Sequence, residues 1–258
     1  MRPPLLKKAL GQHHLVDGAL CGPLVRFLEP IGQRVLEIGP GGGVLTAELM
    51  AAGARVLGWE LDLEWAVELR RRLPGVQLVI GDALEIAWSR LPVPTLAAGN
   101  LPYNVATAIL ERMLPHHERV PRAAFLVQKE VADRLVARPG DEAFGALSLL
   151  VAAYAHTRPL GRVRKGSFRP PPKVEGGFVG LELHPPPLPP GEMPELIALI
   201  RLAFNQRRKT LRNALAAGWG RERAEAVIMA VGLPEKVRGE ELGLEVFLAI
   251  HRQAQAIC

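Results

Sequence analysis

Short apolar runs in the first half of the chain predict the strands of a buried sheet. Each run places apolar residues at successive positions and ends in glycine or a polar residue. Runs of this kind, bounded by turn residues, are typical of strands that are covered on both faces. We therefore predict strands at residues 34–39, 55–60, 76–81, 95–99 and 123–128.

Helical patterns fill the intervals between these strands. We predict helices at residues 44–52, 63–73 and 106–114, the second of which is stopped by a Pro-Gly pair. Strands that alternate with helices form a parallel sheet with helices on both faces. A late strand at residues 174–183, with glycine at alternate positions, completes the predicted α/β domain.

The composition changes after this late strand. Residues 184–191 are rich in proline, which is incompatible with a helix or an inner strand, and they have the character of a semi-rigid linker. The patterns that follow are helical only, and we predict helices at residues 194–217, 221–231 and 244–256. We therefore expect an α/β domain at residues 1–187 and a small all-helical domain at residues 188–258.

The chain is basic, and its positive charges are clustered. The net charge is +6, and residues 158–174 carry six positive charges and no acid. Further clusters lie at residues 207–212 and at Arg2, Lys7 and Lys8. A single cluster is typical of a solvated face, but three together favour a nucleic acid partner.

Other features of the sequence bound the cellular setting. The apolar runs are too short to span a bilayer, and the N-terminus carries no apolar leader segment. Cys21 and Cys258 form neither a disulfide framework nor a metal-ligand cluster. We therefore expect a cytoplasmic protein without a membrane partner.

A glycine loop follows the first predicted strand, in the pattern Glu37-x-Gly39-x-Gly41-x-Gly43. Glycines let the backbone turn tightly and approach a ligand at the carboxyl end of a strand. The nicotinamide fingerprint fails here, because its third glycine falls on Val44. A purely structural turn gives a similar pattern, so the loop alone is weak evidence.

Acidic residues at the ends of the next two strands strengthen the prediction of a ligand site at this edge of the sheet. Glu60 closes the second strand and is placed to accept hydrogen bonds from ribose hydroxyls, and Asp82 closes the third and can accept from an adenine amine. The sequence contains no phosphate-binding loop of the nucleoside triphosphatase type. A nucleoside cofactor without such a loop fits S-adenosylmethionine.

The fourth strand ends in Asn100-Leu101-Pro102-Tyr103. An adenine amine is a poor nucleophile, and two hydrogen-bond acceptors can favour its pyramidal form. The Asn100 side-chain oxygen and the Leu101 carbonyl are placed for this, Pro102 fixes the turn, and Tyr103 offers a face for stacking. The sulfonium of the cofactor activates the methyl group for transfer, so the protein chiefly aligns the reactants.

Phe168 lies inside the basic segment and has two interpretations. A base drawn out of an RNA stack needs apolar walls on both sides, and Phe168 is a candidate for the second wall. A phenylalanine that anchors a proline-rich loop to the core would give the same pattern. The sequence leaves both interpretations open.

Taken together, these motifs resemble those of the ribosomal RNA small-subunit adenine N6-dimethyltransferase family, of the KsgA type. The resemblance covers almost the full length, and its most specific parts are the motifs Asn100–Tyr103 and Phe204–Thr210. It implies a Rossmann-like, S-adenosylmethionine-dependent methyltransferase domain at residues 1–187 and a helical RNA-recognition domain at residues 188–258. The implied reaction is transfer of two methyl groups to each of two adjacent adenosines near the 3′ end of 16S ribosomal RNA, in a pre-30S particle.

The resemblance also implies a set of cofactor-binding residues. The N-terminal motif is expected to close over the cofactor, together with the strand ends, and the full set is Gln12, His13, Leu15, Gly39, Gly41, Glu60, Asp82, Ala83 and Asn100. His14 departs from the family, which usually has phenylalanine there. The tandem histidines alone do not form a metal-ligand cluster, so we predict no metal site.

The expected RNA contacts come from two regions. If residues 194–217 form one helix, Arg201, Arg208 and Arg212 share a narrow stripe on one face, and Arg164 and Lys165 extend the basic surface. We expect a monomer. Two alternatives remain: a large-subunit ribosomal RNA methyltransferase of the macrolide-resistance type, and a ribosome assembly or transcription factor that has kept the fold.

Overall fold

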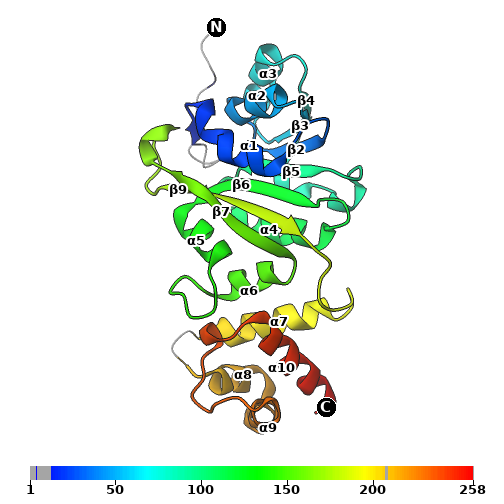
Figure 1. Ribbon diagram of the computed structural model, residues 1–258, viewed down its shortest axis with the longest axis vertical. Helices are drawn as coiled ribbons and strands as arrows, with labels where there is room; N and C mark the ends of the chain where they lie inside the picture. The colour runs from blue at the N-terminus through cyan, green and yellow to red at the C-terminus, as the bar shows by residue number, and fades with distance from the viewer. Residues whose placement is uncertain (1–3, 5–12, 207–208, 258) are drawn as a thin grey trace. The chain divides into compact units, whose positions relative to one another are not determined.

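The computed structural model describes residue 4 and residues 13–206 and 209–257. The chain forms two compact units (Figure 1). The first comprises Met1–Asp133 and Ala155–Pro185, and the second comprises Arg134–Tyr154 and Pro186–Cys258. Residues 134–154 thus group with the C-terminal helices, although they lie between strands of the sheet in sequence.

The first unit is built on a seven-stranded sheet in the order β4-β3-β2-β5-β6-β9-β7. Its strands are β2 (Arg34–Ile38), β3 (Arg55–Glu60), β4 (Gln77–Ile80), β5 (Leu96–Asn100), β6 (Arg122–Gln128), β7 (Ala155–Val163) and β9 (Gly176–Leu183). The strands from β4 to β6 are parallel, as predicted. β9, the late strand whose direction the sequence did not specify, runs antiparallel to both β6 and β7. The connection from β7 to β9 contains no crossover helix that could return the chain in parallel.

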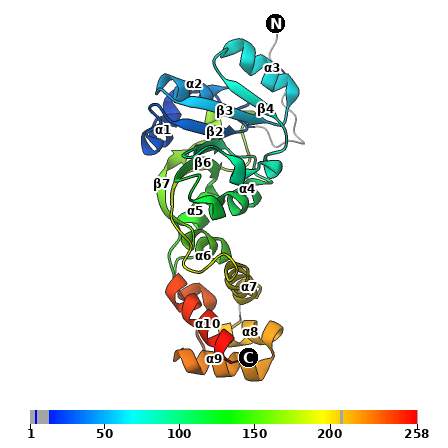
Figure 2. The ribbon, with the colours of Figure 1, turned by 90° about the vertical axis from the view of Figure 1, so that its right-hand side faces the viewer.

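Helices cover both faces of this sheet. They are α1 (Gly22–Leu28), α2 (Val44–Ala51), α3 (Leu63–Arg72), α4 (Ala106–Met113) and α5 (Lys129–Val136), the last of which reaches into the second unit. In Figures 1 and 2, α1, α2 and α3 lie on one side of the strands and α4 lies on the other. α2, α3 and α4 begin at the residues that the sequence predicted. α1 and α5 were not predicted.

The glycines of β9 have a packing role on the α1 side. A Cβ atom on Gly180 would lie 2.6 Å from the ring of Phe27 in α1, which is closer than real contacts allow. Glycine at this position therefore lets the Phe27 ring lie directly on the strand. Gly180 is one of the alternating glycines in the late strand, and it permits this close approach of α1 to the sheet.

A small antiparallel ribbon joins the N-terminal motif to the basic segment. β1 (His14–Leu15) pairs with β8 (Phe168–Arg169), with His14 opposite Arg169 and Leu15 opposite Phe168. The Val16 amide continues the pairing with a 3.0 Å hydrogen bond to the Ser167 carbonyl. This ribbon places His13 and His14 beside the carboxyl ends of the central strands.

The second unit is helical. It contains α6 (Ala146–Ala152), α7 (Met193–Phe204), α8 (Leu211–Trp219), α9 (Arg221–Val231) and α10 (Leu244–Ala256). The Phe204 ring contacts the rings of Phe144 and Phe247, with centroids 6.2 and 6.1 Å apart. In the part of the chain that the structure describes, no helix has both the length and the apolar character needed to cross a membrane.

The prediction of a single helix at residues 194–217 is wrong. The helical segment α7 ends with Asn205 as its C-cap, and α8 starts anew after Thr210. Thr210 has extended backbone angles, and its Oγ1 accepts a hydrogen bond from the Asn213 amide at 3.4 Å. This is an N-cap, and it favours a new helix start over continuation of the old one.

Candidate active site

A pocket opens at the carboxyl ends of the central parallel strands, where ligands bind in open α/β sheets. It collects most of the residues predicted from the sequence, namely His13, Gly39, Gly41, Glu60, Asp82, Ala83, Asn100, Leu101, Pro102 and Tyr103. Leu15 and Phe168 do not line it, and Gln12 lies outside the described residues. The separate strand-end predictions thus converge on one cavity.

The glycine loop forms the wall between β2 and α2. Gly39, Gly41 and Gly43 have φ angles of +65°, +48° and +79°, which is the left-handed region that favours glycine. Gly41 is also constrained by packing, because a Cβ atom there would lie 2.6 Å from the Nε2 of His14. The loop therefore presents bare backbone to the pocket.

Glu60 holds this loop in place as well as facing the pocket. Its Oε2 accepts a hydrogen bond from the Gly41 amide at 2.9 Å, and its Oε1 accepts from the Asp62 amide at 2.8 Å. The side chain is buried, and this burial raises the pKa of Glu60, opposed by the backbone hydrogen bonds. Each oxygen keeps a second lone pair that can accept from a ligand hydroxyl.

Asp82 shapes the next strand end. Its Oδ1 accepts a hydrogen bond from the Leu84 amide at 2.8 Å, which caps the short helix Ala83–Glu85. Its backbone carbonyl accepts from the Trp59 indole at 3.1 Å. Trp59 lines the pocket but was not predicted from the sequence. The signal available was its position on β3 directly before Glu60.

Asn100 is anchored by the N-terminal motif. Its Nδ2 donates a 2.6 Å hydrogen bond to the His13 carbonyl. A carbonyl only accepts, so the amino end of the amide must face His13, and Oδ1 occupies the opposite end. The amide is thus oriented by the protein before any substrate binds. Next in the chain, Leu101 is buried and its amide donates to the Leu126 carbonyl at 2.9 Å.

Tyr103 lies beside this amide and is half-buried. Burial raises the pKa of the Tyr103 hydroxyl, which has no hydrogen-bond partner among the described residues. The ring stacks against the His13 imidazole, with centroids 5.5 Å apart and an interplanar angle of 29°. An aromatic surface is therefore present next to Asn100, as the sequence predicted.

The structure does not place Phe168 at the pocket. The ring is only 2% exposed and belongs to the hydrophobic core, where its Cζ would lie 3.2 Å from a Cβ atom on Gly176. The geometry therefore matches the interpretation in which Phe168 anchors a proline-rich loop. As a second wall of the base site, the ring is not in position here.

His14 takes a place on the other side of the pocket. Its ring meets the edge of Trp65 with centroids 4.5 Å apart and packs against the glycine loop. Burial lowers the pKa of His14 to about 4, more than the nearby Asp62 raises it, so the imidazole is neutral at neutral pH. The described residues contain no group of three or more histidine, cysteine or acidic side chains that could hold a metal ion.

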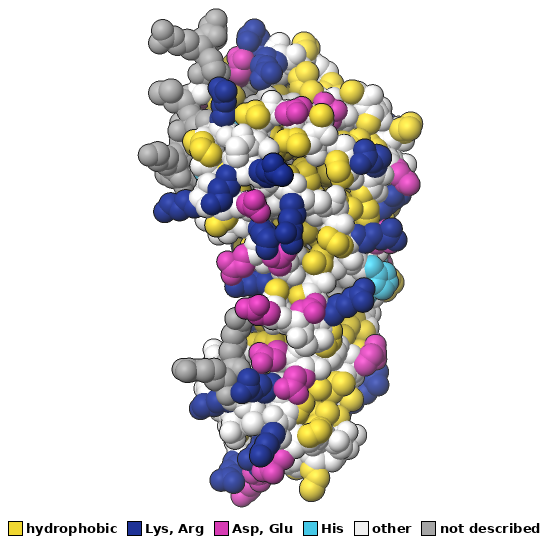
Figure 3. Space-filling model, turned by 60° about the vertical axis from the view of Figure 1, so that its left-hand side comes forward, with side chains coloured by type: hydrophobic (Ala, Val, Ile, Leu, Met, Phe, Trp, Pro, Cys, Tyr) yellow, Lys and Arg dark blue, Asp and Glu magenta, His cyan; other side chains and the backbone are white. Residues whose placement is uncertain are grey.

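The predicted RNA-binding residues lie in both units. Arg164 and Lys165 are exposed at the short helix Lys165–Ser167 between β7 and β8. Figure 3 shows lysine and arginine side chains spread over the face that it presents, with acidic side chains between them. Arg201 lies on α7 and Arg212 on α8, so no single helix carries both, and Arg208 lies outside the described residues.

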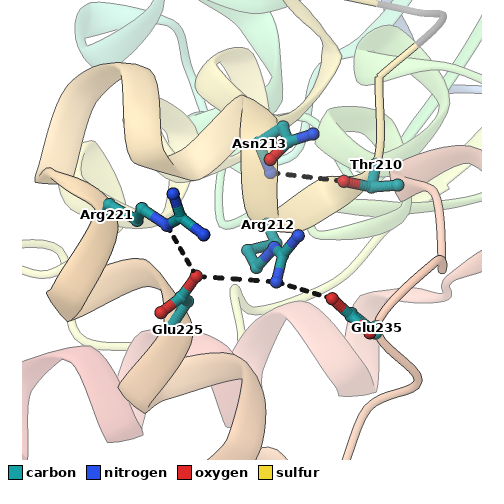
Figure 4. A network of polar contacts seen from close by, with 6 residues as sticks. All are labelled: Thr210, Arg212, Asn213, Arg221, Glu225 and Glu235. Carbon is teal, nitrogen blue, oxygen red and sulfur yellow. Dashed lines mark hydrogen bonds and ion pairs between the residues drawn. The ribbon is translucent and has the colours of Figure 1, made fainter.

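Arg212 is engaged in a charge network within the second unit (Figure 4). Its guanidinium lies 2.8 Å from a Glu235 carboxylate oxygen and 3.5 Å from a Glu225 oxygen, which also binds Arg221 at 2.9 Å. The proposed arginine stripe therefore lacks its structural basis. A phosphate that binds Arg212 would have to share it with Glu235 and Glu225.

The comparison with known families decides the membership of the chain. Residues 5–254 match the family model described as ribosomal RNA adenine dimethylase. The chain belongs to the ribosomal RNA adenine dimethylase family. The match extends over both units, so the helical unit is part of the family's common architecture as well as the sheet.

Curated relatives agree with this family. The chain is 40% identical to the ribosomal RNA small subunit methyltransferase A of Kineococcus radiotolerans, over 96% of this chain and 87% of the relative. It is equally 40% identical to the proteins of that name from Acidothermus cellulolyticus and Rhodospirillum rubrum, over 97% of this chain and 88% of each relative.

Two solved structures share the fold of this chain. A dimethyladenosine transferase from Plasmodium falciparum superposes with a TM-score of 0.78 at 20% identity, covering 95% of this chain and 98% of that one. The 23S rRNA methyltransferase ErmE superposes with a TM-score of 0.71 at 23% identity, covering 93% and 99%. This chain therefore shares its fold with a protein named as a dimethyladenosine transferase and with one named as a 23S rRNA methyltransferase.

Proposed function

We propose that this chain transfers methyl groups from S-adenosylmethionine to the N6 amines of two adjacent adenosines near the 3′ end of 16S ribosomal RNA. The observation that carries the proposal is the oriented amide of Asn100, held by the His13 carbonyl in the same pocket as Glu60 and Asp82. The curated relatives, all named small subunit methyltransferase A, favour the small-subunit RNA as substrate.

The pocket residues fit the proposed cofactor. Gly39 and Gly41 line the pocket with left-handed backbone, and a main chain without side chains suits the methionine part of the cofactor. Glu60 is placed for the ribose hydroxyls, and Asp82 with Ala83 for the adenine. When bound, S-adenosylmethionine supplies a methyl group on a sulfonium, which leaves as a neutral thioether.

The protein's own contribution is alignment. In the first transfer the Asn100 Oδ1 and the Leu101 carbonyl would accept the two hydrogens of the target amine and favour its pyramidal form, and in the second transfer one hydrogen would remain for them to hold. The Tyr103 ring supports the adenine by stacking, which is worth about 1–3 kcal/mol per base in comparable sites. With the cofactor bound, its carbon–sulfur bond would supply the methyl group to the amine nitrogen, which would then release a proton to solvent. No strong base is required.

The RNA partner is proposed to be the small-subunit RNA within a pre-30S particle, bound by a monomer. Arg164 and Lys165 are exposed on the first unit and suit phosphate contacts, and Arg201 is exposed on α7. We assign RNA recognition to the helical domain at residues 188–258, and cofactor binding and catalysis to residues 1–187. Arg208 and Arg212 remain proposed contacts, with Arg212 in competition with its acidic partners.

Methylation of small-subunit particles tests the proposal. Particles from cells that lack this protein are incubated with it and labelled S-adenosylmethionine, and the modified nucleotides are mapped by mass spectrometry. We expect dimethyladenosine at two adjacent positions near the 3′ end of 16S RNA. Modification of large-subunit RNA instead would establish the macrolide-resistance type of activity, and binding without any methyl transfer would establish an assembly factor.

A further inference from the structure

A second cavity lies within the helical unit. It is lined by residues of α7, α8, α9 and α10 and has a volume of about 520 Å³, which is within the range of about 300–1,000 Å³ for ligand pockets. Its apolar lining comes mainly from alanine and leucine side chains of α7. Its polar lining comes from Glu195, Arg223, His251 and Gln255, and Trp219 supplies an aromatic ring. This mixture of one large ring and a few polar groups suits a planar, polar ligand.

Trp219 and Arg223 form a stacked pair in the wall of this cavity. The Arg223 guanidinium lies over the indole, 5.4 Å from the ring centroid. Its Nη2 donates a 2.7 Å hydrogen bond to the Ala254 carbonyl in the last turn of α10, and this bond holds the guanidinium in place. Unpaired RNA bases stack on aromatic rings and on guanidinium planes. The pair is therefore suited to contact with a nucleic acid base.

Glu195 brings a carboxylate to the same cavity. The Gln255 Nε2 donates a hydrogen bond to its Oε2, which ties α7 to α10 and restricts the carboxylate. A carboxylate only accepts hydrogen bonds and has about four lone-pair sites, so Glu195 keeps capacity for a ligand. Among the RNA bases, guanine alone presents two adjacent donors, N1–H and N2–H, on its Watson–Crick edge. A carboxylate beside a stacking surface therefore favours guanine over the other bases.

His251 is a buried polar side chain in the cavity wall. Among the described residues its Nε2 has no hydrogen-bond partner, and the Glu192 oxygen at 3.5 Å forms an ion pair with it only when the imidazole is protonated. Buried polar groups in folded proteins nearly always have a partner, which can be a water molecule or a ligand. This histidine therefore favours a polar occupant of the cavity over an apolar side chain.

We propose that this cavity binds an unpaired guanine nucleotide of RNA, with the base stacked on Trp219 and its Watson–Crick edge on Glu195. The inference rests on the proposed function for the source of the nucleotide, which is the small-subunit RNA. Arg201 and Arg252 are exposed on α7 and α10, two of the helices that line the cavity, and suit the flanking phosphates. The helical unit thus recognises one base of the RNA in addition to its backbone.

Short oligonucleotides without adenine test this cavity separately from the site of the target base. The probes are the fluorescein-labelled pentanucleotides UUGUU, UUIUU and UUUUU, where I is inosine, and their binding to the full chain is measured by fluorescence anisotropy at one salt concentration. All three carry the same phosphates, so differences in affinity report the central base. Inosine lacks the N2 amine and so lacks one of the two donors. We expect UUGUU to bind at least about fivefold more tightly than either of the others.

Three variants and a control assign the contacts. Glu195→Gln replaces one accepting oxygen with a donor, so it should lower the affinity for UUGUU to that for UUIUU and change binding of UUUUU by less than about twofold. Trp219→Ala should weaken binding of UUGUU about five- to hundredfold, and Trp219→Phe, which keeps a ring, should recover most of the loss. Glu245→Gln, in the first turn of α10, is the matched control and should leave all three affinities unchanged.

Thermal melting of each variant separates loss of the site from loss of the fold, and Trp219→Phe and Glu195→Gln decide if Trp219→Ala does not fold. Equal binding of the three pentanucleotides by the wild-type chain would overturn the inference, as would an unchanged preference for UUGUU over UUIUU in Glu195→Gln. Weaker binding of Trp219→Ala to small-subunit particles without any guanine preference would point to a protein occupant and would also overturn it. A wild-type chain that prefers UUGUU but methylates no small-subunit RNA would instead overturn the proposed function.

Discussion

The Oε2 of Glu60 accepts a 2.9 Å hydrogen bond from the Gly41 amide, which ties the end of β3 to the glycine loop that follows β2. One carboxylate therefore faces the pocket and also fixes the backbone that forms its wall. Loss of this group should lower cofactor affinity for two reasons: a ligand contact is missing, and the glycine loop loses a hydrogen bond that fixes it.

Glu60→Gln keeps the size of the side chain but replaces one accepting oxygen with a donor. Both oxygens accept backbone amides here, so one of these hydrogen bonds must be lost. We expect S-adenosylmethionine to bind about ten- to hundredfold more weakly, which corresponds to about 1.5–3 kcal/mol. Asp82→Ala should act in the same direction. Titration calorimetry measures this, with Glu85→Gln, an exposed neighbour, as control; unchanged affinity in both variants contradicts the assignment.

Asn100→Ala should lower the rate of methyl transfer more than the affinity for the cofactor. The variant lacks the oriented Oδ1, so single-turnover methyl transfer should slow while cofactor affinity changes little. Tyr103→Ala should impair capture of the adenine by about 1–3 kcal/mol. Rapid-quench kinetics at saturating cofactor across a range of RNA concentrations separates the two effects. Normal rates in both variants would remove these residues from the mechanism.

Gly41→Ala should weaken cofactor binding through its backbone. The residue has φ of +48°, and the added methyl would meet the His14 ring at 2.6 Å. Left-handed backbone at a non-glycine residue costs about 1–3 kcal/mol. Gly32→Ala is the matched control, because it has φ of +70° but nothing within 4 Å of its Cβ position. Thermal melts should show a loss in both, whereas only Gly41→Ala should lower cofactor affinity.

The buried carboxyl of Glu37 should make the free energy of unfolding depend on pH. Burial raises the pKa of this carboxyl from 4.5 to about 8. The folded state then holds a proton that the unfolded state releases above pH 4.5, so this contribution to the free energy of unfolding declines as the pH rises from about 4.5 to about 8. Glu37→Gln should flatten that decline in thermal melts at pH 5 to 9. An equally steep decline in the variant would show that other groups cause it.

The Arg212 network makes a prediction about RNA binding. Arg201→Ala/Arg212→Ala should bind small-subunit particles more weakly, with a shallower dependence on salt, if these side chains contact phosphates. Glu235→Gln removes an acidic partner of Arg212 without removing a positive charge. It should lower stability by at most about 1 kcal/mol and leave RNA affinity equal or higher. Filter binding across a salt series measures RNA affinity in both variants. Weaker RNA binding by Glu235→Gln would show that the intact charge network, and not the positive charge alone, is needed.

The central strands could be predicted because burial and periodicity are local. β3 runs from Arg55 to Glu60 as predicted, and the acidic residues at strand ends meet because parallel strands share one carboxyl edge. β7 was missed because residues 155–163 mix histidine, arginine and proline with apolar residues, as suits a strand at the sheet edge.

Contacts between distant residues could not be predicted in the same way. The Asn100 amide meets a carbonyl 87 residues earlier, and no local pattern signals that pairing. The burial of Phe168 likewise depends on how the core closes around the loop. At residues 205–210, apolar spacing suggested one helix, but the local N-cap at Thr210 divided it. Tertiary context and capping therefore decided the details that periodicity left open.

The pairing of β1 with β8 also constrains the order of folding. β1 has two residues and cannot be stable without a partner, and its partner residues are 168 and 169. During synthesis from the N-terminus, β1 therefore gains its strand partner only when residues 168 and 169 have left the ribosome. The pocket wall that His13 and His14 form is completed only after all the central parallel strands exist, so a nascent chain cannot assemble this site early.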